Sequence, residues 1–471
     1  MKKPQSGIIP EDRLGIATDL YQLTMANGYL AMGKEKEIAT FDLFVRNLPK
    51  NRSYLVVAGL EQALHYLTNV RFTEEDVELL KQKPDFKNTD EKFWDYLRNF
   101  KFTGDVWAMP EGTIAFGNEP LMTVTAPIIE AQIAETYLLT CYNHQTKIAS
   151  KTARCVEAAK GRAVLEFGMR RTDIGASARA ARAAYVGGAI GSSNVVAEAL
   201  FGVPSFGTHA HSWVMSFDSE EEAFAAYFKV YGEHTVALVD TYDTLEGVLT
   251  AAKLPGEIKG IRLDSGDLVA LSKEARKILD ENRSKNCKIF ASNDLDEYKI
   301  EDLLSKGGQV DIFGVGTMMT LSADEPALGG VYKLAELVRD GVAIPKLKLS
   351  KEKCTYPGKK QVYRKYNDLG EFEYDIIALR GELDKQKKLY EKYDDAGRLE
   401  ALLVPMIEKG KLVYGLPELW EIRDRTICNI KDLPDKYRRT KADHSYRVDI
   451  SPKLDALTKK TAAKYGGVKK C

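Results

Sequence analysis

The chain has 471 residues, too many for one ordinary hydrophobic core, so its length predicts two or three domains, one of them large enough to be a barrel. Its 68 lysines and arginines equal its 68 aspartates and glutamates, which excludes the strong basic field typical of nucleic-acid and membrane-surface proteins. We therefore expect no nucleic-acid partner and no membrane partner. Any anionic ligand must be held by local charges.

The six cysteines lie far apart in the sequence, and no two have the spacing of a metal site or a redox motif: Cys141, Cys155, Cys287, Cys354, Cys428 and Cys471. No apolar run approaches the length of a membrane span, and the N-terminal residues lead to no signal-peptide core. These features predict a cytoplasmic protein with reduced thiols.

The first third of the chain mixes helices and strands without a parallel-sheet rhythm. Its patterns predict a helix over 18–32 that presents Tyr21, a charged helical stretch near 73–98, and strands over 38–45, 54–58, 103–108 and 121–126. We interpret residues 1–130 as an N-terminal α+β domain.

From about residue 130 the pattern becomes a repeated strand and helix. Helices are expected near 130–160 and 175–186, and strands over 163–167, 235–239, 259–263, 288–291, 311–315 and 331–336. Such repeats imply parallel strands joined by helical crossovers, so residues 131–340 are predicted to form an α/β barrel domain with its site at the rim where the strands end. Residues 341–471, denser in charge, are predicted to be a C-terminal α+β extension.

Polar side chains follow two of the predicted strands. Arg262 and Asp264 share one face at the end of the strand 259–263, and a tight turn with Ser265 and Gly266 comes next. Asp240 ends the strand 235–239. A cation and carboxylates at one rim suit a phosphorylated sugar with Mg²⁺, because magnesium prefers hard oxygen ligands and keeps several waters. A helix cap with a local salt bridge is an equally good reading of these residues alone.

Two further strand ends carry features that suit an anion. Gly314 and Gly316 precede Thr317, so backbone N–H groups could approach a phosphate there, although a Gly-X-Gly segment is usually only a turn. Arg170 and Arg171 follow the strand 163–167, and guanidinium groups match phosphate or carboxylate oxygens in a bidentate fork. Because adjacent side chains diverge, we expect one of them, Arg170, to face the ligand.

Two imidazoles lie two residues apart in the segment 207–212 (Gly-Thr-His-Ala-His-Ser), in a chain with only six histidines. His209 and His211 could include a nucleophile toward phosphate, a proton carrier or a metal ligand, and they could equally be satisfied, half-buried imidazoles. A zinc site is disfavoured, because Cys141, Asn143 and His144 do not complete a convincing ligand set.

Taken together and in this order, six segments resemble the nicotinate phosphoribosyltransferase family. The segments are 18–25 (Thr-Asp-Leu-Tyr-Gln-Leu-Thr-Met), 166–171 (Glu-Phe-Gly-Met-Arg-Arg), 207–212, 262–267 (Arg-Leu-Asp-Ser-Gly-Asp), 292–294 (Ser-Asn-Asp) and 314–317 (Gly-Val-Gly-Thr). The resemblance runs from about residue 14 to 340 and is weaker beyond.

The resemblance implies a type II phosphoribosyltransferase fold, an irregular α/β barrel with an N-terminal α+β domain and a C-terminal extension. It implies an enzyme of NAD salvage that joins nicotinate to phosphoribosyl pyrophosphate, with ATP as a co-substrate, Mg²⁺ as a cofactor and a homodimer with shared active sites. No cysteine cluster matches the zinc site that some members carry, so no structural metal is expected.

The family's site residues fall on named positions of this sequence. The phosphorylated histidine falls on His211, and the ring-stacking tyrosine falls on Tyr21, which the dimer architecture implies reaches the partner's active site. Asp240, Arg262 and Asp264 are expected to be catalytic, with Asp240 and Asp264 near Mg²⁺, directly or through water. Substrate contacts are expected from Phe167, Arg170, Arg171, Ser193, Thr208, Ser212, Ser265, Gly266, Asn293, Gly314, Gly316 and Thr317.

Position 193 bears on the choice of base. A related branch that uses nicotinamide has an aspartate where this chain has Ser193. A carboxylate would repel nicotinate, whereas a serine hydroxyl can donate a hydrogen bond to it, as can Ser212. The alternatives are a phosphoribosyltransferase for another pyridine base, such as nicotinamide or quinolinate, and a non-catalytic barrel that binds a phosphosugar.

Overall fold

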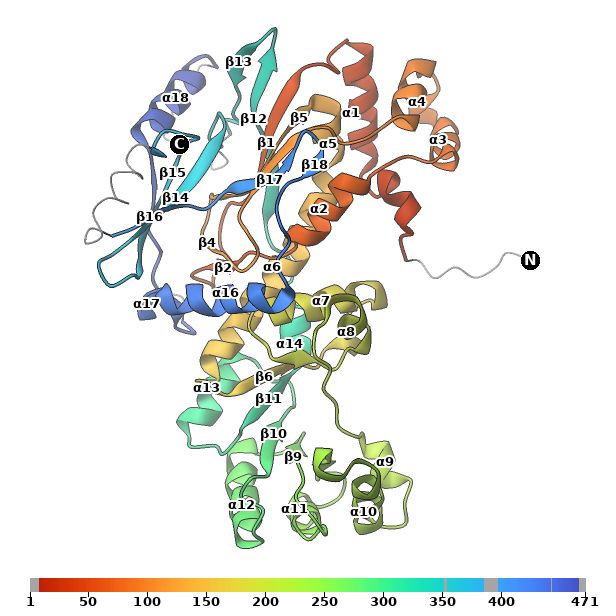
Figure 1. The fold of residues 1–471 in the computed structure, drawn as a ribbon, viewed down its shortest axis with the longest axis vertical. Coiled ribbons are helices and arrows are strands. Elements are labelled where there is room, and N and C mark those ends of the chain that lie inside the picture. Colours follow the sequence, from red (N-terminus) through yellow and green to blue (C-terminus); the bar gives the residue numbers. More distant parts are fainter. Residues whose placement is uncertain (1–7, 351–353, 385–396, 442, 466–471) are drawn as a thin grey trace.

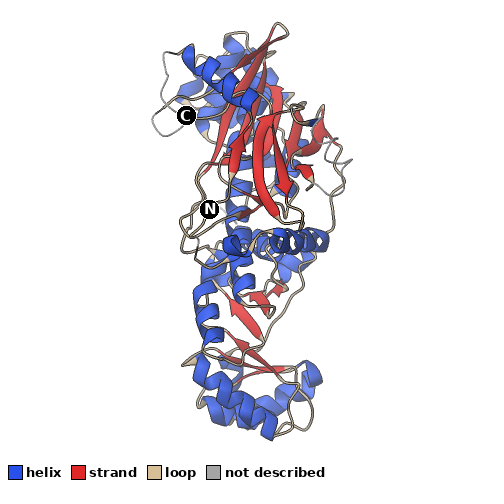
Figure 2. Cartoon of the chain, turned by 90° about the vertical axis from the view of Figure 1, so that its left-hand side faces the viewer, coloured by secondary structure: helices blue, strands red, loops and turns tan. Residues whose placement is uncertain are grey.

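The computed structural model describes residues 8–350, 354–384, 397–441 and 443–465. The molecule is elongated, with an antiparallel sheet at one end, a parallel sheet at the other, and the helix α16 (Leu419–Asp432) crossing between them (Figures 1 and 2). Within the described ranges, none of the helices combines the length and the apolar character that crossing a membrane requires.

The antiparallel sheet has seven strands. In spatial order they are β13 (Val342–Pro345), β12 (Gly330–Arg339), β1 (Ile38–Val45), β5 (Pro120–Pro127), β3 (Asp105–Ala108), β17 (Val404–Glu408) and β18 (Lys411–Leu412). The helices α1 (Leu20–Ala31), α2 (Leu60–Asn69) and α5 (Ile128–Ile133) supply side chains to the same hydrophobic core. A short pair, β2 (Leu55–Val56) and β4 (Ile114–Ala115), lies apart from this sheet.

The predicted strand at 331–336 is present as β12, but it does not belong to the parallel repeat. It pairs antiparallel with β1, so the chain returns to the first sheet directly after the parallel one. The pair β17 and β18 returns to the same sheet from still farther along the chain. The boundaries at residues 130 and 340 stay predictions. The antiparallel sheet draws strands from both sides of each of them.

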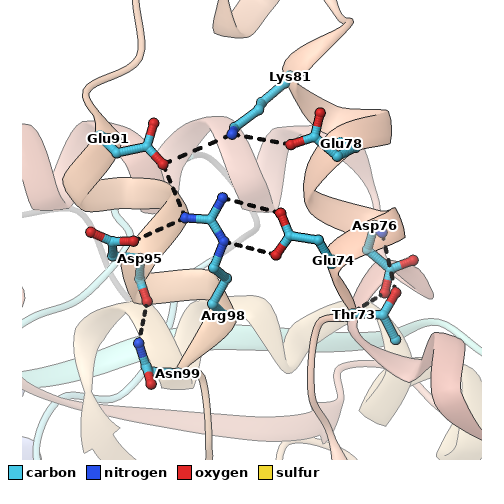
Figure 3. Close-up of polar contacts among 9 residues, drawn as sticks. All are labelled: Thr73, Glu74, Asp76, Glu78, Lys81, Glu91, Asp95, Arg98 and Asn99. Atoms are coloured by element: carbon cyan, nitrogen blue, oxygen red, sulfur yellow. Dashed lines mark hydrogen bonds and ion pairs between the residues drawn. The ribbon is translucent and has the colours of Figure 1, made fainter.

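The charged stretch 73–98 is two short helices, not one. A 3₁₀ turn, η2 (Pro84–Phe86), separates α3 (Glu74–Lys81) from α4 (Glu91–Arg98), because proline cannot continue a helix. Arg98 of α4 donates a hydrogen bond to Glu74 of α3, and Lys81 of α3 lies 3.8 Å from Glu91 of α4, so both contacts link the two helices (Figure 3). The charges of the predicted helical stretch therefore hold a helix pair together.

The parallel sheet confirms the α/β class predicted for the central region. Its six strands are, in spatial order, β7 (Gly191–Ser192), β6 (Ala163–Glu166), β11 (Ile312–Val315), β10 (Lys288–Ala291), β9 (Gly260–Leu263) and β8 (Val236–Leu238). All five pairings are parallel, and β7 and β8 are the two edges, which gives the irregular barrel its incomplete wall.

Helices connect these strands and cover them. They are α6 (Glu135–Ala158), α7 (Ile174–Val186), α8 (Val195–Phe201), α9 (His211–Met215), α10 (Glu220–Tyr231), α11 (Thr244–Ala252), α12 (Leu268–Glu281), α13 (Glu297–Ser305) and α14 (Thr317–Thr320). Buried alanines of α7, such as Ala180 and Ala183, give it a small-residue face, and α7 packs closely against α6. Because parallel strands end on the same edge of a sheet, this layout brings the polar segments that follow them to one rim.

Among its described residues, the C-terminal region adds a four-stranded sheet and the helices α16, α17 and α18. The strand order is β16 (Leu399–Ala401), β14 (Lys360–Tyr366), β15 (Phe372–Leu379) and β19 (Val448–Ile450), and α17 (Asp435–Arg438) and α18 (Pro452–Ala463) follow α16. Inside this region Arg364 is fully buried and paired with Asp375 at 2.6 Å.

A buried ion network fastens the parallel sheet to the rest of the molecule. Lys151 of α6 lies 2.5 Å from Glu297 and 3.0 Å from Asp324, and Arg154 lies 2.9 Å from Glu297. Arg52, which precedes β2, reaches the same Asp324 at 3.0 Å. Removing one member would leave a buried charge without its partner, which is costly, so the network fixes how the two halves sit against each other.

Candidate functional site

One carboxylate joins the ends of β8 and β9. Asp240, two residues after β8, accepts hydrogen bonds at Oδ2 from the Asp264 backbone N–H (2.9 Å) and from the Ser265 hydroxyl (2.6 Å). Asp264 in turn accepts a hydrogen bond from Ser292, the first residue after β10. Three neighbouring strand ends are thereby held in register, which brings Asp240, Asp264 and Ser265 together as the sequence predicted.

Arg262 lies at this rim, and its positive charge is only weakly neutralised by the nearby carboxylates. Its guanidinium is 4.0 Å from Asp264, and its buried Nε has no hydrogen-bond partner among the described residues. Burial lowers the pKa of Arg262, and the nearby Arg170 lowers it further, whereas Asp264 and Asp240 raise it. A half-buried guanidinium with an unsatisfied buried donor, within the electrostatic influence of a second cation, is suited to bind an anion.

The turn after β6 supplies the second cation. Arg170 and Arg171 lie in η3 (Met169–Arg171), exposed and without an ion pair to any described residue. The positive charge of Arg170 lies near enough to lower the pKa of Arg262, while which of Arg170 and Arg171 contacts the ligand stays a prediction. Glu166 holds this turn, because it accepts hydrogen bonds from the Gly168 N–H (2.5 Å), the Ser192 hydroxyl (2.6 Å) and Thr320.

Phe167 packs directly on Gly314 of β11 and on Gly316, which follows that strand. A Cβ at Gly314 would lie 2.4 Å from the Phe167 ring, and one at Gly316 would lie 3.2 Å from the Phe167 carbonyl oxygen. Glycine at 314 therefore makes room for an aromatic ring at the rim, while the role of these glycines as a phosphate cradle stays a prediction. The ring lines a pocket of about 170 Å³ together with Thr208, Phe206 and Phe290.

His209 has a structural role. Its imidazole is buried, and its Nε2 accepts a hydrogen bond from the backbone N–H of Leu238 in β8 at 3.1 Å. Burial lowers its pKa to about 4, so the ring is neutral near pH 7. His209 is the satisfied imidazole of the pair, and it fixes the segment 207–212 to the end of β8.

His211 is available for chemistry. It is the first residue of α9 and half-buried, and its Nδ1 lies 3.1 Å from the hydroxyl of Thr241, the residue after Asp240. This contact brings the imidazole to the rim that carries Asp240 and Arg262. It leaves Nε2 without a hydrogen-bond partner among the described residues.

The other predicted contacts fall into two groups. Most follow the strand ends on exposed or half-buried positions of the same rim: Ser193, Ser212, Gly266, Asn293 and Thr317. Tyr21 does not: it is 49% exposed on α1, at the opposite end of the molecule from β8 and β9 (Figure 1). One chain alone does not unite Tyr21 with the strand-end rim.

Sequence reasoning missed Thr241, Glu220 and the part played by Ser292. Glu220, at the start of α10, has a buried Oε1 without a hydrogen-bond partner in the described structure. Burial raises its pKa to about 7, with Asp240 and Asp243 adding to the effect. In sequence it is indistinguishable from the glutamates that favour any helix N-terminus. Ser292 lies in the quoted segment 292–294, so a signal for it existed.

The rim offers two carboxylates for a divalent cation. No group of three or more histidine, cysteine or carboxylate side chains in the described ranges has the arrangement of a metal site. Mg²⁺ does not need one, because it commonly takes one or two carboxylates and completes its shell with water and substrate phosphates. Asp240 Oδ1 is buried and has no hydrogen-bond partner among the described residues, so a free hard oxygen is present.

Three family models together match most of the chain. They describe the nicotinate phosphoribosyltransferase N-terminal domain over residues 16–143, the nicotinate phosphoribosyltransferase family over 163–371, and the C-terminal domain over 359–458. The rim residues from Phe167 to Thr317 all lie within the middle match.

Individual relatives agree with these models. A nicotinate phosphoribosyltransferase of Bacillus subtilis is 41% identical over 462 residues, covering 94% of each chain, and one of Mycobacterium tuberculosis is 41% identical over 448 residues, covering 93% of this chain and 91% of the relative. The crystal structure of human nicotinic acid phosphoribosyltransferase superposes with a TM-score of 0.79 at 28% identity, covering 96% of this chain and all of the other. A nicotinate-nucleotide pyrophosphorylase of Pyrococcus furiosus gives a TM-score of 0.72 at 27% identity, covering 92% of this chain and 99% of the other.

The pKa of His209 generates a prediction about acid stability. The folded pKa of about 4 lies below the ordinary value of 6.5, so the unfolded chain takes up a proton that the folded chain refuses as the pH falls from about 6.5 to 4. Wild-type protein loses stability over that window. His209→Gln keeps an acceptor for the Leu238 N–H and does not titrate. The free energy of unfolding of this variant should therefore fall by about 2 kcal/mol less than that of the wild type, after allowance for solvent screening.

Urea unfolding of both proteins near pH 7 and near pH 4.5 measures this difference. The exposed histidine variant His444→Gln serves as the control and should follow the wild type. Parallel losses in the wild type and His209→Gln would show that His209 is not held neutral in the folded state.

Proposed function

The chain belongs to the nicotinate phosphoribosyltransferase family, and from that premise we propose that it joins nicotinate to phosphoribosyl pyrophosphate, giving nicotinate mononucleotide and pyrophosphate in NAD salvage. The observation that supports this function best is the weakly balanced Arg262 beside Arg170 at the joined strand ends. A cationic rim of this kind suits a substrate that carries a pyrophosphate and a second that carries a carboxylate.

Departure of pyrophosphate sets the first requirement on the site. Displacement at the anomeric carbon passes through a transition state with oxocarbenium character, so the leaving group's growing charge must be neutralised. Arg262 supplies a fixed donor for that charge, held in place by the joined ends of β8 and β9. Asp240 and Asp264 would hold Mg²⁺, which supplies further charge neutralisation on the phosphate oxygens when bound.

Nicotinate must be held with its ring nitrogen in line with the anomeric carbon. Phe167, fixed against Gly314, offers an aromatic surface, and Arg170 offers a partner for the carboxylate. No general base is needed, because the pyridine nitrogen attacks with a lone pair that carries no proton.

His211 couples the reaction to ATP. With Nδ1 directed at the Thr241 hydroxyl, Nε2 carries the free lone pair that attacks the γ-phosphorus of ATP. The N–P bond forms as the bond from phosphorus to the bridging oxygen breaks, and ADP leaves; water later cleaves the N–P bond and releases phosphate. Thr241 therefore selects which imidazole nitrogen is phosphorylated.

A homodimer with shared active sites accounts for the position of Tyr21. Leu20 and Met25, next to Tyr21 on α1, are exposed apolar side chains, and so are Val195 and Leu200 on α8 near the rim. A second copy of the chain could cover both patches and carry its Tyr21 to this rim, where the ring would stack on nicotinate. We place the enzyme in the cytoplasm, in keeping with its balanced charge and scattered cysteines.

Removal of the phosphorylated imidazole tests the ATP coupling. His211→Ala should abolish the link between ATP consumed and product formed, and slow transfer without ATP should remain, because the Arg262 rim is intact. Parallel assays of ADP and nicotinate mononucleotide measure the ratio, with His444→Ala as the control that keeps it. A coupled His211→Ala enzyme would refute the assignment.

Position 193 tests the choice of base. Ser193→Asp places a carboxylate near the nicotinate carboxylate and should weaken the use of nicotinate relative to nicotinamide by about 1–3 kcal/mol. Ser193→Asn, similar in size and uncharged, is the matched control. The ratio of kcat/KM for the two bases measures the effect, and an unchanged ratio in Ser193→Asp removes Ser193 from the site.

Subunit mixing tests the shared site. Tyr21→Ala and Arg262→Gln should each be nearly inactive, and hybrids of the two should contain one intact site made of Arg262 from one subunit and Tyr21 from the other. Random mixing should restore about a quarter of wild-type activity. Absence of any recovery in hybrids verified by mass spectrometry would show that Tyr21 acts within its own subunit or not at all.

A further inference from the structure

A second pocket shares no lining residue with the strand-end rim. It has a volume of about 440 Å³ and lies among the segment that precedes α1, the helix α6 and the first turn of α7. Its apolar wall includes Ile9, Leu14, Tyr137 and Cys141. None of its lining residues belongs to the set predicted to bind nicotinate, phosphoribosyl pyrophosphate or ATP, so the reaction proposed above does not use it.

The pocket also contains two polar groups whose bonding capacity is unused. Arg179 of α7 makes no hydrogen bond or ion pair with any described residue. His144 of α6 has a buried Nε2 without a hydrogen-bond partner in the described part of the chain. Burial lowers the pKa of His144 to about 4, and Lys147 and Arg179 lower it further, so near pH 7 the ring is neutral and Nε2 can accept a hydrogen bond.

The acidic residues of the lining are engaged elsewhere. Glu11 contacts His65 at 2.9 Å, and Asp173 caps α7 by accepting a hydrogen bond from the Gly175 N–H at 2.8 Å. Neither forms an ion pair with Arg179. The pocket therefore has one uncompensated cation and one buried acceptor beside an apolar wall.

An aromatic ring is the best filler for the apolar part. One face of Tyr137 is covered by Tyr66, with ring centroids 4.0 Å apart and planes 10° apart, so its ring is held rigidly. Sites for small organic ligands typically have volumes of about 300–1,000 Å³, with mostly apolar walls and a few polar groups that fix orientation. The pocket matches this description.

We propose that this pocket is a second binding site, separate from the catalytic rim, for a planar aromatic anion that also carries an N–H or O–H donor. Its carboxylate pairs with Arg179, its donor bonds His144 Nε2, and its ring packs on Tyr137. Asp173, which lines the pocket, follows Arg171 by two residues, so the pocket adjoins the segment that carries the arginines of the rim. The proposal does not depend on the reaction proposed above.

Indole-3-acetate is a suitable probe because it has a flat ring, a carboxylate and an N–H donor. Calorimetric titration of the full-length protein should give a dissociation constant below about 5 mM, as expected for a ligand of this size. Indole-3-acetamide, which lacks the charge, and 1-methylindole-3-acetate, which lacks the donor, should each bind roughly 10-fold more weakly or worse. No measurable binding of indole-3-acetate overturns the proposal.

Substitutions of the pocket residues Arg179 and His144 test where indole-3-acetate binds. Arg179→Gln keeps the side-chain length and removes the charge, and it should weaken indole-3-acetate roughly 10- to 100-fold, whereas Arg283→Gln should not. His144→Phe should abolish the preference for indole-3-acetate over its methylated analogue. Circular dichroism and Tm verify that each variant is folded, and a variant that fails this check is replaced by Arg179→Lys, which retains binding under the proposal.

Competition with nicotinate tests whether this pocket is distinct from the rim. Saturating nicotinate should leave the affinity for indole-3-acetate within about twofold, and Arg262→Gln should also leave it unchanged. Competition by nicotinate, or loss of binding in Arg262→Gln with Arg179→Gln unaffected, would place the probe in the catalytic site and overturn the second site. Both results are read from binding alone, so they stand whether or not the chain transfers phosphoribosyl groups.

Discussion

The hydrogen bonds that Asp240 accepts from Asp264 and Ser265 are the interaction on which the rim depends. They join β8 to β9 at the point where the strands end, and the bond from Ser292 to Asp264 extends the connection to β10. Only with these ends in register does Arg262 stand as a fixed, weakly balanced cation instead of a flexible surface arginine. Preorganised charge of this kind stabilises a transition state without reorganising during the reaction, which is what departure of pyrophosphate requires.

The two histidines divide the work between structure and chemistry. His209 accepts a hydrogen bond from the backbone of Leu238 and thereby anchors the segment to the sheet. His211 directs Nδ1 toward Thr241, which leaves Nε2 available for the phosphoryl group that we propose it carries. The segment 207–212 thus contains both the residue that anchors it, His209, and the residue available for chemistry, His211. The buried network around Lys151 and Glu297 acts over a longer range. It pairs Lys151 and Arg154 of α6 with Glu297 of α13, and so holds α6 against the parallel half of the molecule.

Much of this could be predicted from the sequence, and the failures have physical causes. Polar residues at the ends of successive strands, here Asp240, Arg262 and Asp264, predict a parallel sheet with one polar rim, because parallel strands end at the same edge of a sheet. The strand predicted at 331–336 belongs to the antiparallel sheet. An apolar run does not reveal which sheet it joins; only the pairing of β12 with β1 does. Glu220 and Thr241 were invisible, because their importance comes from neighbours distant in sequence. The exposed position of Tyr21 on α1 gives the implied shared site a geometric reason that no sequence pattern could supply.

The central claim is that the His211 imidazole, which contacts Thr241, carries phosphate during turnover. Incubation of the wild-type enzyme with γ-³²P-labelled ATP, followed by peptide mapping under alkaline conditions, tests it directly. The account predicts an acid-labile label in the peptide that contains His211, retained in His209→Gln and absent from His211→Ala. A label on any other residue, or an enzyme that consumes ATP in step with product while no acid-labile label forms, would contradict it.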